Sequence, residues 1–491
     1  MVPSRLALVL AILIIVGISL SVALNHKSPE TQSPTVTNGW DRIDHLILSE
    51  ASKNGQRSGY YYPSMPGTIV FLDRKAVQPA ATGNYQVAGV AELDFSSFIN
   101  GRVYVIEGSK LVLYTVSTSG EVSKKEVNIT SLSRRLAPAA RIQVRIGGST
   151  GSAIIPPSIY PAGVIAGEKS AILLVHVSYS GVPPVGGANG SVFYPDKVLV
   201  VVMDPGLRVV GHMMIDGYLI DARLNGDNLV LTTGLPSILR MPEPLVVHPS
   251  INLTSIDPGD VVVSGRPLGY VLVVSLNTTS MDYSAKAILS DTESLRLLLT
   301  KKGLLYLAMN SPGPRPSTRI LALEASPSRV RLAGNTTLPG VIYSQWQLEP
   351  YGDYLVAVTG SGGRGRVSLY VLNATSLSVV SRLENISLPG EEVYAVRIVG
   401  DKLLFVTFLH KDPLYAVSLR DPRNPVILGF LKAPGVDQYL HPLDGGLILG
   451  VGREGSSLRV SLYKLTEKGL IVLDRYYMKY AYSPVLGPRG P

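Results

Sequence analysis

Cysteine is absent from the 491 residues, and charged residues make up only 16% of the chain, against roughly 25% in an ordinary soluble protein. A chain without cysteine has no disulfides, no thiolate metal site and no cysteine nucleophile. The formal net charge is +9, which is modest for this length. The basic residues are dispersed, so their number alone does not indicate nucleic-acid binding, and we expect none.

Long helical patterns are also scarce, since no three-turn helix is evident after residue 51. Glycine (48) and proline (35) are frequent, and 46% of the residues are hydrophobic. This composition excludes a disordered chain and argues against a coiled coil or a helical bundle. From Gly83 onward the chain consists of short apolar or alternating runs bounded by Gly, Asp, Asn and Pro, which are typical of strands.

The N-terminus contains an uncharged, apolar run of 19 residues, Leu6 to Leu24, preceded by Arg5. Its length matches a membrane-spanning helix with a cytoplasmic N-terminus. The alternative is a signal peptide cleaved after Ser21-Val22-Ala23. Both interpretations predict export, with the bulk of the chain on the extracellular side of the cell membrane, or secreted if the segment is cleaved.

We divide the chain into four segments. Residues 1–24 are the anchor or signal peptide, and residues 25–40, rich in Ser, Thr and Pro, are a flexible linker. Residues 41–82 are a lead-in with a short helix, because apolar residues recur at helical spacing between Trp40 and Ala51. Residues 83–491 form the main domain.

Seven Asn-x-Ser/Thr sequons support export independently, because glycosylation requires exposed loops on the exported side. The alternative is that Asn, Ser and Thr simply gather in turns. The sequons begin at Asn128, Asn189, Asn252, Asn277, Asn335, Asn373 and Asn385.

One unit recurs along the main domain: a turn with Gly, Asp or Asn, then a hydrophobic strand and further strands. Its clearest instances begin at Tyr351, Val399 and Leu443. The last three spacings fall in the range of roughly 40–50 residues expected for a four-stranded propeller blade. The marker strands lie at Val103, Ala171, Leu229, Leu304, Tyr354, Leu403 and Leu447. We therefore predict an all-β fold, a β-propeller of seven blades, preceded by one transmembrane helix.

Two stretches, Gly83–Tyr114 and Val396–Glu454, resemble an archaeal family of secreted β-propellers that is distantly similar to WD40 propellers. The marks of the second stretch are Asp412-Pro413-Leu414-Tyr415, Asp421-Pro422, Asn424-Pro425, Gly435 and Tyr439-Leu440-His441-Pro442. In the first stretch, Ala88 and Ala91 stand at two positions that are acidic in the family, whereas Glu92 and Asp94 are kept. The resemblance implies an exported propeller with no established enzymatic activity.

The resemblance also bears on how the ring closes, because the family usually continues beyond the point where this sequence ends. Closure would then borrow strands from residues 41–82, or the ring would have one blade fewer. Eight blades or incomplete closure remain alternatives.

Two glycine motifs look catalytic but lack the context that catalysis requires. Gly360–Gly365 fits a dinucleotide-binding pattern, and Gly147–Gly151 fits a nucleophile elbow. Each would need a helix directly afterwards, and each is followed by strand-like sequence. We interpret Gly360–Gly365 as a glycine hairpin turn and reject the nucleophile elbow at Gly147–Gly151. We predict no catalytic residue, no metal site and no cofactor.

The remaining candidates are structural or binding residues. None of the seven histidines has metal-ligand spacing. We expect His441 to satisfy loop carbonyls between two blades. The candidates are Glu92, Asp94, His410, Asp412, Asp437 and His441.

The function that we expect is a membrane-anchored binding or scaffold module whose partner is a cell-surface protein or a glycan, met on loops such as Ser180–Ser191 and Gly234–Ser250. The alternative is an enzyme, hydrolase, lyase or quinoprotein-like, with its active site in the central channel. Such an enzyme needs acids, histidine and arginine converging from several blades, and the sequence reveals no such set.

Overall fold

The computed structural model divides the chain into Met1–Ser33 and Pro34–Pro491, and all described residues belong to the second unit. The predicted anchor, Leu6–Leu24, lies outside them. Among the helices of the described part, none is both long and apolar enough to cross a membrane. The described residues are 35–36, 39–53, 86–146, 149–179, 185–186, 192–193, 196–240, 244–290, 295–311, 313–360, 366–408, 412–433, 436–466, 469–479 and 481.

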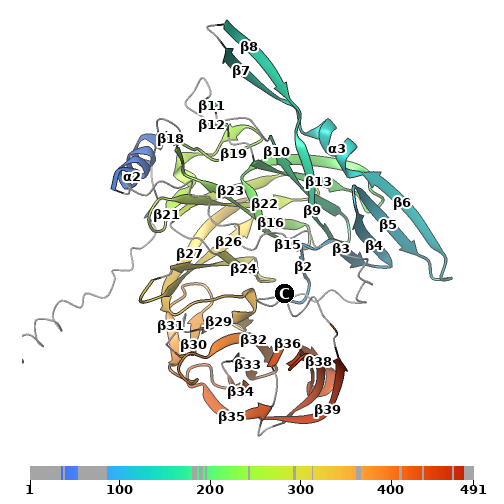
Figure 1. The fold of residues 1–491 in the computed structure, drawn as a ribbon, viewed down its shortest axis with the longest axis vertical. Helices are drawn as coiled ribbons and strands as arrows, with labels where there is room; N and C mark the ends of the chain where they lie inside the picture. The colour runs from blue at the N-terminus through green and yellow to red at the C-terminus, as the bar shows by residue number, and fades with distance from the viewer. Residues whose placement is uncertain are drawn as a thin grey trace, which may run out of the picture. The chain divides into compact units, whose positions relative to one another are not determined.

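Seven successive sheets, each built on an antiparallel meander of four strands, make up the described part of the main domain (Figure 1). The first is β3 (Ser96–Ile99), β4 (Arg102–Glu107), β5 (Lys110–Val116) and β6 (Val122–Asn128); the second is β9 (Ser158–Ala166), β10 (Ala171–Ser178), β13 (Asp196–Met203) and β14 (Val209–Asp216); the third is β15 (Tyr218–Asn225), β16 (Asn228–Pro236), β22 (Gly269–Asn277) and β23 (Tyr283–Ser290); the fourth is β24 (Leu295–Leu299), β25 (Leu304–Ser311), β26 (Ser317–Ser326) and β27 (Arg329–Pro339); the fifth is β28 (Leu348–Tyr351), β29 (Tyr354–Thr359), β30 (Ser368–Asn373) and β31 (Val379–Leu383); the sixth is β32 (Glu392–Val399), β33 (Lys402–Phe408), β34 (Asp412–Ser418) and β35 (Val426–Ala433); the seventh is β36 (Val436–Leu443), β37 (Leu447–Glu454), β38 (Ser457–Thr466) and β39 (Gly469–Lys479).

Short elements extend or decorate this series. In the third sheet, β2 (Val90–Glu92) pairs with β15, while β21 (Val261–Val263) runs parallel to β23 and pairs with β1 (Thr35–Val36). In the second sheet, β19 (Ser250–Ile251) and β20 (Thr254–Ser255) continue beyond β14. The others are the hairpins β7 (Ala140–Ile146) with β8 (Ser149–Ile155), β11 (Val185–Gly186) with β12 (Val192–Phe193) and β17 (Ile238–Arg240) with β18 (Pro244–Val246), the helices α2 (Trp40–Lys53) and α3 (Ile129–Leu136), and the 3-10 turns η1 (Pro258–Asp260), η2 (Gln345–Gln347) and η3 (Asp444–Gly446).

The predicted marker residues all fall in the second strand of a sheet, so the repeat in the sequence corresponds to the repeat in the structure. The turn before this strand explains why the repeat is visible. A glycine in left-handed conformation occupies it in six sheets, a conformation that glycine adopts without steric cost. These glycines are Gly101, Gly226, Gly303, Gly352, Gly400 and Gly446, with φ between 59° and 79°.

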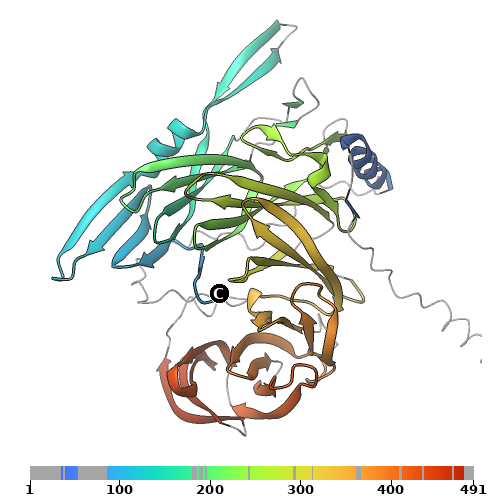
Figure 2. The ribbon, with the colours of Figure 1, turned by 180° about the vertical axis from the view of Figure 1, so that it is seen from behind.

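Six apolar cores join each sheet to the next. Figures 1 and 2 show the sheets from two sides, following one another along the chain. Alternate side chains of a strand point to opposite faces, so one strand serves two cores. In β29, Leu355 and Ala357 pack against the fourth sheet, whereas Val356 and Val358 pack against the sixth. The sheets are therefore stacked face to face in chain order.

The lead-in segment differs in part from the expectation. The predicted helix is confirmed as α2, and Thr35 and Val36, within the expected linker, form a strand on the third sheet. All four strands of the seventh sheet come from Val436–Lys479, and residues 41–53 supply no strand to it. The rest of residues 41–82 lies outside the described part.

A second helix, α3, follows β6, and its eight residues make it shorter than the three-turn helices for which the sequence after residue 51 gives no sign. Asn128 caps its start by accepting a hydrogen bond from the Ser131 backbone N–H at 2.8 Å. Ile129 and Leu132 are buried, and two arginines occupy its last turn, where cations are favourable. Its eight residues are too few to give a clear periodic signal.

Candidate functional site

The first strands of neighbouring sheets contact one another, and they carry a group of polar side chains that we call the inner-strand cluster. Its members are Glu92 on β2, Asp221 and Arg223 on β15, Gln345 and Trp346 on η2, Glu349 on β28, Arg397 on β32, and Tyr439 and His441 on β36. The predicted candidates Glu92 and His441 both belong to it.

Arg223 is the centre of the first half of this cluster and is almost completely buried. Its Nη1 donates to Asp221 Oδ1 at 2.5 Å, and its Nη2 donates to Gln345 Oε1 at 2.8 Å. Glu92 Oε2 lies 3.8 Å from Nη2 and also accepts from Gln345 Nε2 at 3.4 Å. The guanidinium is thus held by partners from three elements, which stabilises a buried charge.

Arg397 is the centre of the second half. Its Cζ lies 3.5 Å from the centroid of the Trp346 ring and 5.4 Å from that of Tyr439. Its Nη1 donates to the Val396 carbonyl at 2.8 Å and lies 4.0 Å from Glu349 Oε1. Two aromatic faces attract the guanidinium through cation–π interactions.

Burial changes the acidity of the carboxyl groups in this cluster. It raises the pKa of Glu92 and of Asp221, against the opposing effect of Arg223. It raises the pKa of Glu349 to about 8, with Arg397 acting in the opposite direction. Burial in a low-dielectric environment disfavours the ionised form of a carboxylic acid, so Glu349 is largely neutral at pH 7.

Asp437 and His441 lie on β36 but have different partners. Asp437 is buried, accepts a hydrogen bond from Arg459 Nη2 at 3.0 Å and a second one from the Tyr463 hydroxyl. His441 Nδ1 forms its hydrogen bond with the Tyr439 hydroxyl, 2.9 Å away. We expected His441 to bond loop carbonyls, but its Nδ1 bonds the Tyr439 hydroxyl instead. The reason is that His441 lies within a strand, opposite Leu449, and not in a loop.

The other predicted candidates make no contact with the inner-strand cluster within the described residues. Asp94 forms an isolated bridge with Val164, and its side chain accepts from the Phe95 backbone N–H at 2.7 Å. Asp412 is the first residue of β34 and pairs with Ala433. His410 lies outside the described residues.

Five of the predicted sequons lie at turns or strand ends, which are the positions that glycosylation requires. The side chain of Asn128 caps α3, those of Asn277 and Asn373 accept from backbone N–H groups of the following turn, and Asn252 and Asn385 have φ of 49° and 59°. Asn335 lies within β27 opposite Leu321. Asn189 lies outside the described residues.

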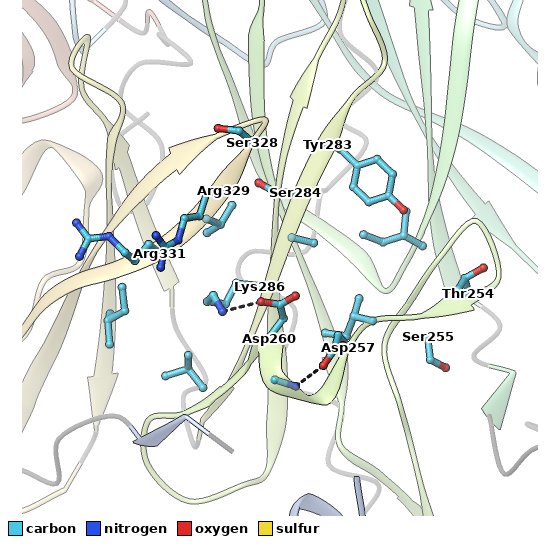
Figure 3. Close-up of a pocket in the computed structure, with 17 residues that line it drawn as sticks. Thr254, Ser255, Asp257, Asp260, Tyr283, Ser284, Lys286, Ser328, Arg329 and Arg331 are labelled. Atoms are coloured by element: carbon cyan, nitrogen blue, oxygen red, sulfur yellow. Dashed lines mark hydrogen bonds and ion pairs between the residues drawn. The ribbon is translucent and has the colours of Figure 1, made fainter. Parts of the chain in front are cut away.

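A pocket of about 760 Å³ lies away from this cluster, between the outer strands of the third and fourth sheets (Figure 3). We call it the side pocket. Arg329 and Arg331 line it from β27, Tyr283 and Lys286 from β23, and Asp257 and Asp260 from the η1 region. Lys286 donates to Asp260 at 2.9 Å. Arg331 forms a bidentate pair with Glu324.

Arg329 differs from the other cations of the side pocket. It is exposed at the start of β27, and within the described residues its guanidinium has no ion-pair or hydrogen-bond partner. Tyr283 is 42% exposed. The pocket therefore offers one exposed aromatic ring and one cation without a direct partner among the described residues. Arg331 and, to a smaller extent, Arg329 lower the pKa of nearby Glu324.

The described part of the chain contains no cluster of three or more His, Cys, Asp or Glu side chains that could hold a metal ion. The hairpin β7–β8 confirms that Gly147–Gly151 is followed by a strand and not by the helix of a nucleophile elbow. The next described strand after Gly360 is β30, which likewise provides no helix for a dinucleotide.

The sequence analysis missed the inner-strand cluster as a set, although it selected Glu92 and His441. Residues 92, 223, 345 and 397 are far apart in the chain and share no motif. The sequence offered one signal for the two arginines of the cluster, which is their position. Each lies at the end of the first strand of its sheet, a few residues before the turn that leads into the second strand. Arg223 and Arg397 precede Gly226 and Gly400 by three residues.

Comparisons with known proteins give the following relatives. An uncharacterized protein of Archaeoglobus fulgidus is 37% identical over 151 residues, and one of Methanocaldococcus jannaschii is 34% identical over 152 residues. These matches cover 29% and 30% of this chain, and 24% of the length of each relative. The chain thus spans about a quarter of the curated relatives that it matches.

Among solved structures, the crystal structure of Kluyvelomyces marxianus Hsv2 is similar at 10% identity with a TM-score of 0.37, covering 78% of this chain and 96% of the other. A likeness this weak carries no argument. The family model described as "Beta propeller domain" matches residues 80–470. That match spans most of the chain and agrees with the seven stacked sheets, and the chain belongs to the Beta propeller domain family.

Proposed function

We propose that this chain is an exported binding module, a seven-bladed propeller anchored in the cell membrane by Leu6–Leu24 with the propeller on the extracellular side. Its partner is a glycan that carries acidic sugars, bound in the side pocket. A cell-surface protein is the other partner that the sequence analysis considered. Neither a nucleic acid nor a catalytic cofactor is part of this proposal.

The observation that carries the proposal is the side pocket itself. Sugar rings are bound by exposed aromatic faces, hydroxyl groups and charged side chains placed around a concave surface. Tyr283 provides such a face, while Thr254, Ser255 and Ser328 provide hydroxyl groups. Arg329 is available for a carboxylate, because no carboxylate within the described residues pairs with it.

The inner-strand cluster supports a binding role over catalysis. Asp221, Glu92 and Gln345 are occupied in holding Arg223. His441 is hydrogen-bonded to the phenol hydroxyl of Tyr439, and within the described residues no serine or threonine hydroxyl is hydrogen-bonded to it.

The proposal is tested by titrating the soluble propeller with an oligogalacturonate, which carries a carboxylate on every ring, and with a neutral cello-oligosaccharide. We expect calorimetric binding of the acidic sugar alone. Arg329→Gln should weaken it at least tenfold, since it removes the uncommitted cation, and Tyr283→Ala should weaken it similarly. Arg134 is an exposed arginine on α3. The variant Arg134→Gln is therefore the matched control and should bind the acidic sugar like the parent protein.

Unchanged binding in Arg329→Gln and Tyr283→Ala would contradict the side pocket as the glycan site. Equal affinity for the two saccharides would contradict the role of charge. Absence of binding to either saccharide would count against a glycan and favour a protein partner.

An enzyme with its site among the inner strands is the second candidate, and one observation favours it. Three carboxyl groups there, Glu92, Asp221 and Glu349, have a raised pKa, and perturbed acids gather at active sites. Cleavage of the oligogalacturonate during the titration, abolished by Asp221→Asn, would support this alternative.

A further inference from the structure

Three neighbouring side chains of the inner-strand cluster have buried polar atoms that lack a hydrogen-bond partner within the described part of the chain. These atoms are Trp346 Nε1, Glu349 Oε1 and Arg397 Nη2. The three residues are only 6–7% exposed. Buried polar groups in folded proteins are almost always paired, so three orphans side by side require an explanation.

The three atoms belong to one contiguous group. Arg397 Cζ lies 3.5 Å from the Trp346 ring centroid, and Arg397 Nη1 lies 4.0 Å from Glu349 Oε1. The Val396 carbonyl accepts a hydrogen bond from Nη1 at 2.8 Å, while Nη2 has no hydrogen-bond acceptor among the described residues.

The charge of this group is not balanced at neutral pH. The guanidinium keeps its positive charge under all ordinary conditions, and burial keeps Glu349 largely neutral by raising its pKa to about 8. The other titratable groups that interact with Arg397 are Tyr439 on β36 and, more weakly, Glu92 on β2, and His441 is hydrogen-bonded to Tyr439. Glu92 is already engaged by Arg223 and Gln345. A buried cation in this situation favours an added anion.

We propose that Arg397, Trp346 and Glu349 bind the carboxylate group of a small organic acid. One carboxylate oxygen accepts from Arg397 Nη2 and the indole N–H of Trp346. The protonated carboxyl of Glu349 donates to the carboxylate. A planar carboxylate monoanion matches both the single unbalanced charge and the planar donor geometry of the guanidinium, whereas chloride is a single spherical centre and phosphate is tetrahedral.

This site is independent of the side pocket, which lies on the outer strands. Failure of either proposal therefore leaves the other unaffected. A water molecule is the competing occupant, since water can satisfy the same three atoms.

The test uses the intrinsic fluorescence of Trp346. The chain has only two tryptophans, so Trp40→Phe leaves Trp346 as the single emitter. The full-length chain in this background, solubilised in a non-ionic detergent, is titrated with sodium acetate, chloride and phosphate at pH 6.5 and constant ionic strength. We expect a saturable change in Trp346 emission with acetate only, and an acetate-dependent rise in melting temperature.

Substitutions of Arg397 test whether this residue binds the acetate. Arg397→Gln should abolish the acetate response, and Arg397→Lys should weaken it at least tenfold, because lysine keeps the charge but loses the planar donor edge. Arg382→Gln, an exposed arginine on β31, is the control and should respond like the parent. Raising the pH from 6.5 to 9 should weaken acetate binding, because ionised Glu349 neutralises Arg397 and repels the anion.

Three results would overturn the proposal. They are an equal response to chloride and phosphate, no response to acetate, which would assign the site to water, and an unchanged response in Arg397→Gln. If Arg397→Gln does not fold, Trp346→Phe is used as the test variant in its place. Acetate binding to this variant is measured by the rise in melting temperature on adding acetate. That variant should lose most of the acetate effect, and retention of the full effect would contradict the site.

Discussion

Glu349 has an environment unlike that of a surface glutamate. It lies on β28 with little exposure, and Arg397 is 4.0 Å away. Its pKa is raised from 4.5 to about 8. Between these two values the folded state holds a proton that the unfolded chain has released. Stability contributed by the neutral carboxyl is therefore fully present below pH 4.5 and declines as the pH rises toward 8.

We predict that Glu349→Gln becomes progressively more stable relative to the parent protein as the pH rises from 5 to 8. The amide stays neutral in both states, so the variant avoids the cost of keeping a carboxyl protonated in the folded protein while the unfolded chain releases its proton. The relative gain should be on the order of 1 kcal/mol per pH unit. Urea unfolding of both proteins at pH 5, 6, 7 and 8 measures it.

Glu168→Gln is the matched substitution at an exposed site, and its stability relative to the parent serves as the baseline. A difference between Glu349→Gln and the parent that is constant across this pH range would show that Glu349 is ionised in the folded protein. The inner-strand cluster would then hold a second full ion pair.

At the scale of elements, α2 illustrates how a short helix depends on the sheets. Isolated helices of about 14 residues are marginal in water. Here Ile43 and Ile47 are fully buried in the core shared by the second and third sheets. Trp40 stacks on His248 with centroids 3.9 Å apart, and His248 Nε2 lies 2.8 Å from Asp44 Oδ1. Tertiary contacts thus hold this helix.

We predict that Ile47→Ala lowers the free energy of unfolding by about 2–4 kcal/mol, since it removes a buried branched side chain and leaves a cavity. Leu48 is the matched control on the same helix and is 42% exposed. Leu48→Ala should cost less than about 0.5 kcal/mol. Equilibrium unfolding in urea compares the two, and equally small effects would mean that α2 is not docked.

At the scale of the whole molecule, seven sheets share six cores, and each sheet supports its neighbours. Stability of such a series depends on the interfaces between adjacent repeats. The strand β1 adds residues 35 and 36 to the third sheet. If Leu6–Leu24 spans the membrane, at most the residues from 25 to 34 separate it from the folded part.

We predict that the full-length protein, expressed in its native setting, stays in the membrane fraction after high-salt and carbonate washing, because a helix of this length and apolarity inserts stably. A variant lacking residues 1–24 should appear in the supernatant under the same conditions. Release of a full-length-derived chain that begins at Leu24 would instead identify Ser21-Val22-Ala23 as a cleavage site.

Much of the architecture could be predicted from the sequence, because it depends on short-range features. Strand alternation, the turn glycines such as Gly226 and Gly400, and the apolar spacing of Ile43 and Ile47 are each visible within about ten residues. These local preferences placed the second strand of every sheet and the helix α2. The two-turn helix α3 escaped detection because its signal is a cap and three apolar residues.

The candidate sites depended on contacts between distant parts of the chain. Residues 223 and 345 meet through a hydrogen bond of 2.8 Å across two sheets, and nothing near either residue predicts the other. His441 is a visible mark in the sequence, yet its partner Tyr439 follows from the strand that both occupy. Sequence alone determined the strands and their repeat, since backbone conformation is a local property. Tertiary structure alone decided which charges are buried together and which, like Arg329, have no direct partner in the described part of the chain, because these contacts arise only when separate sheets pack.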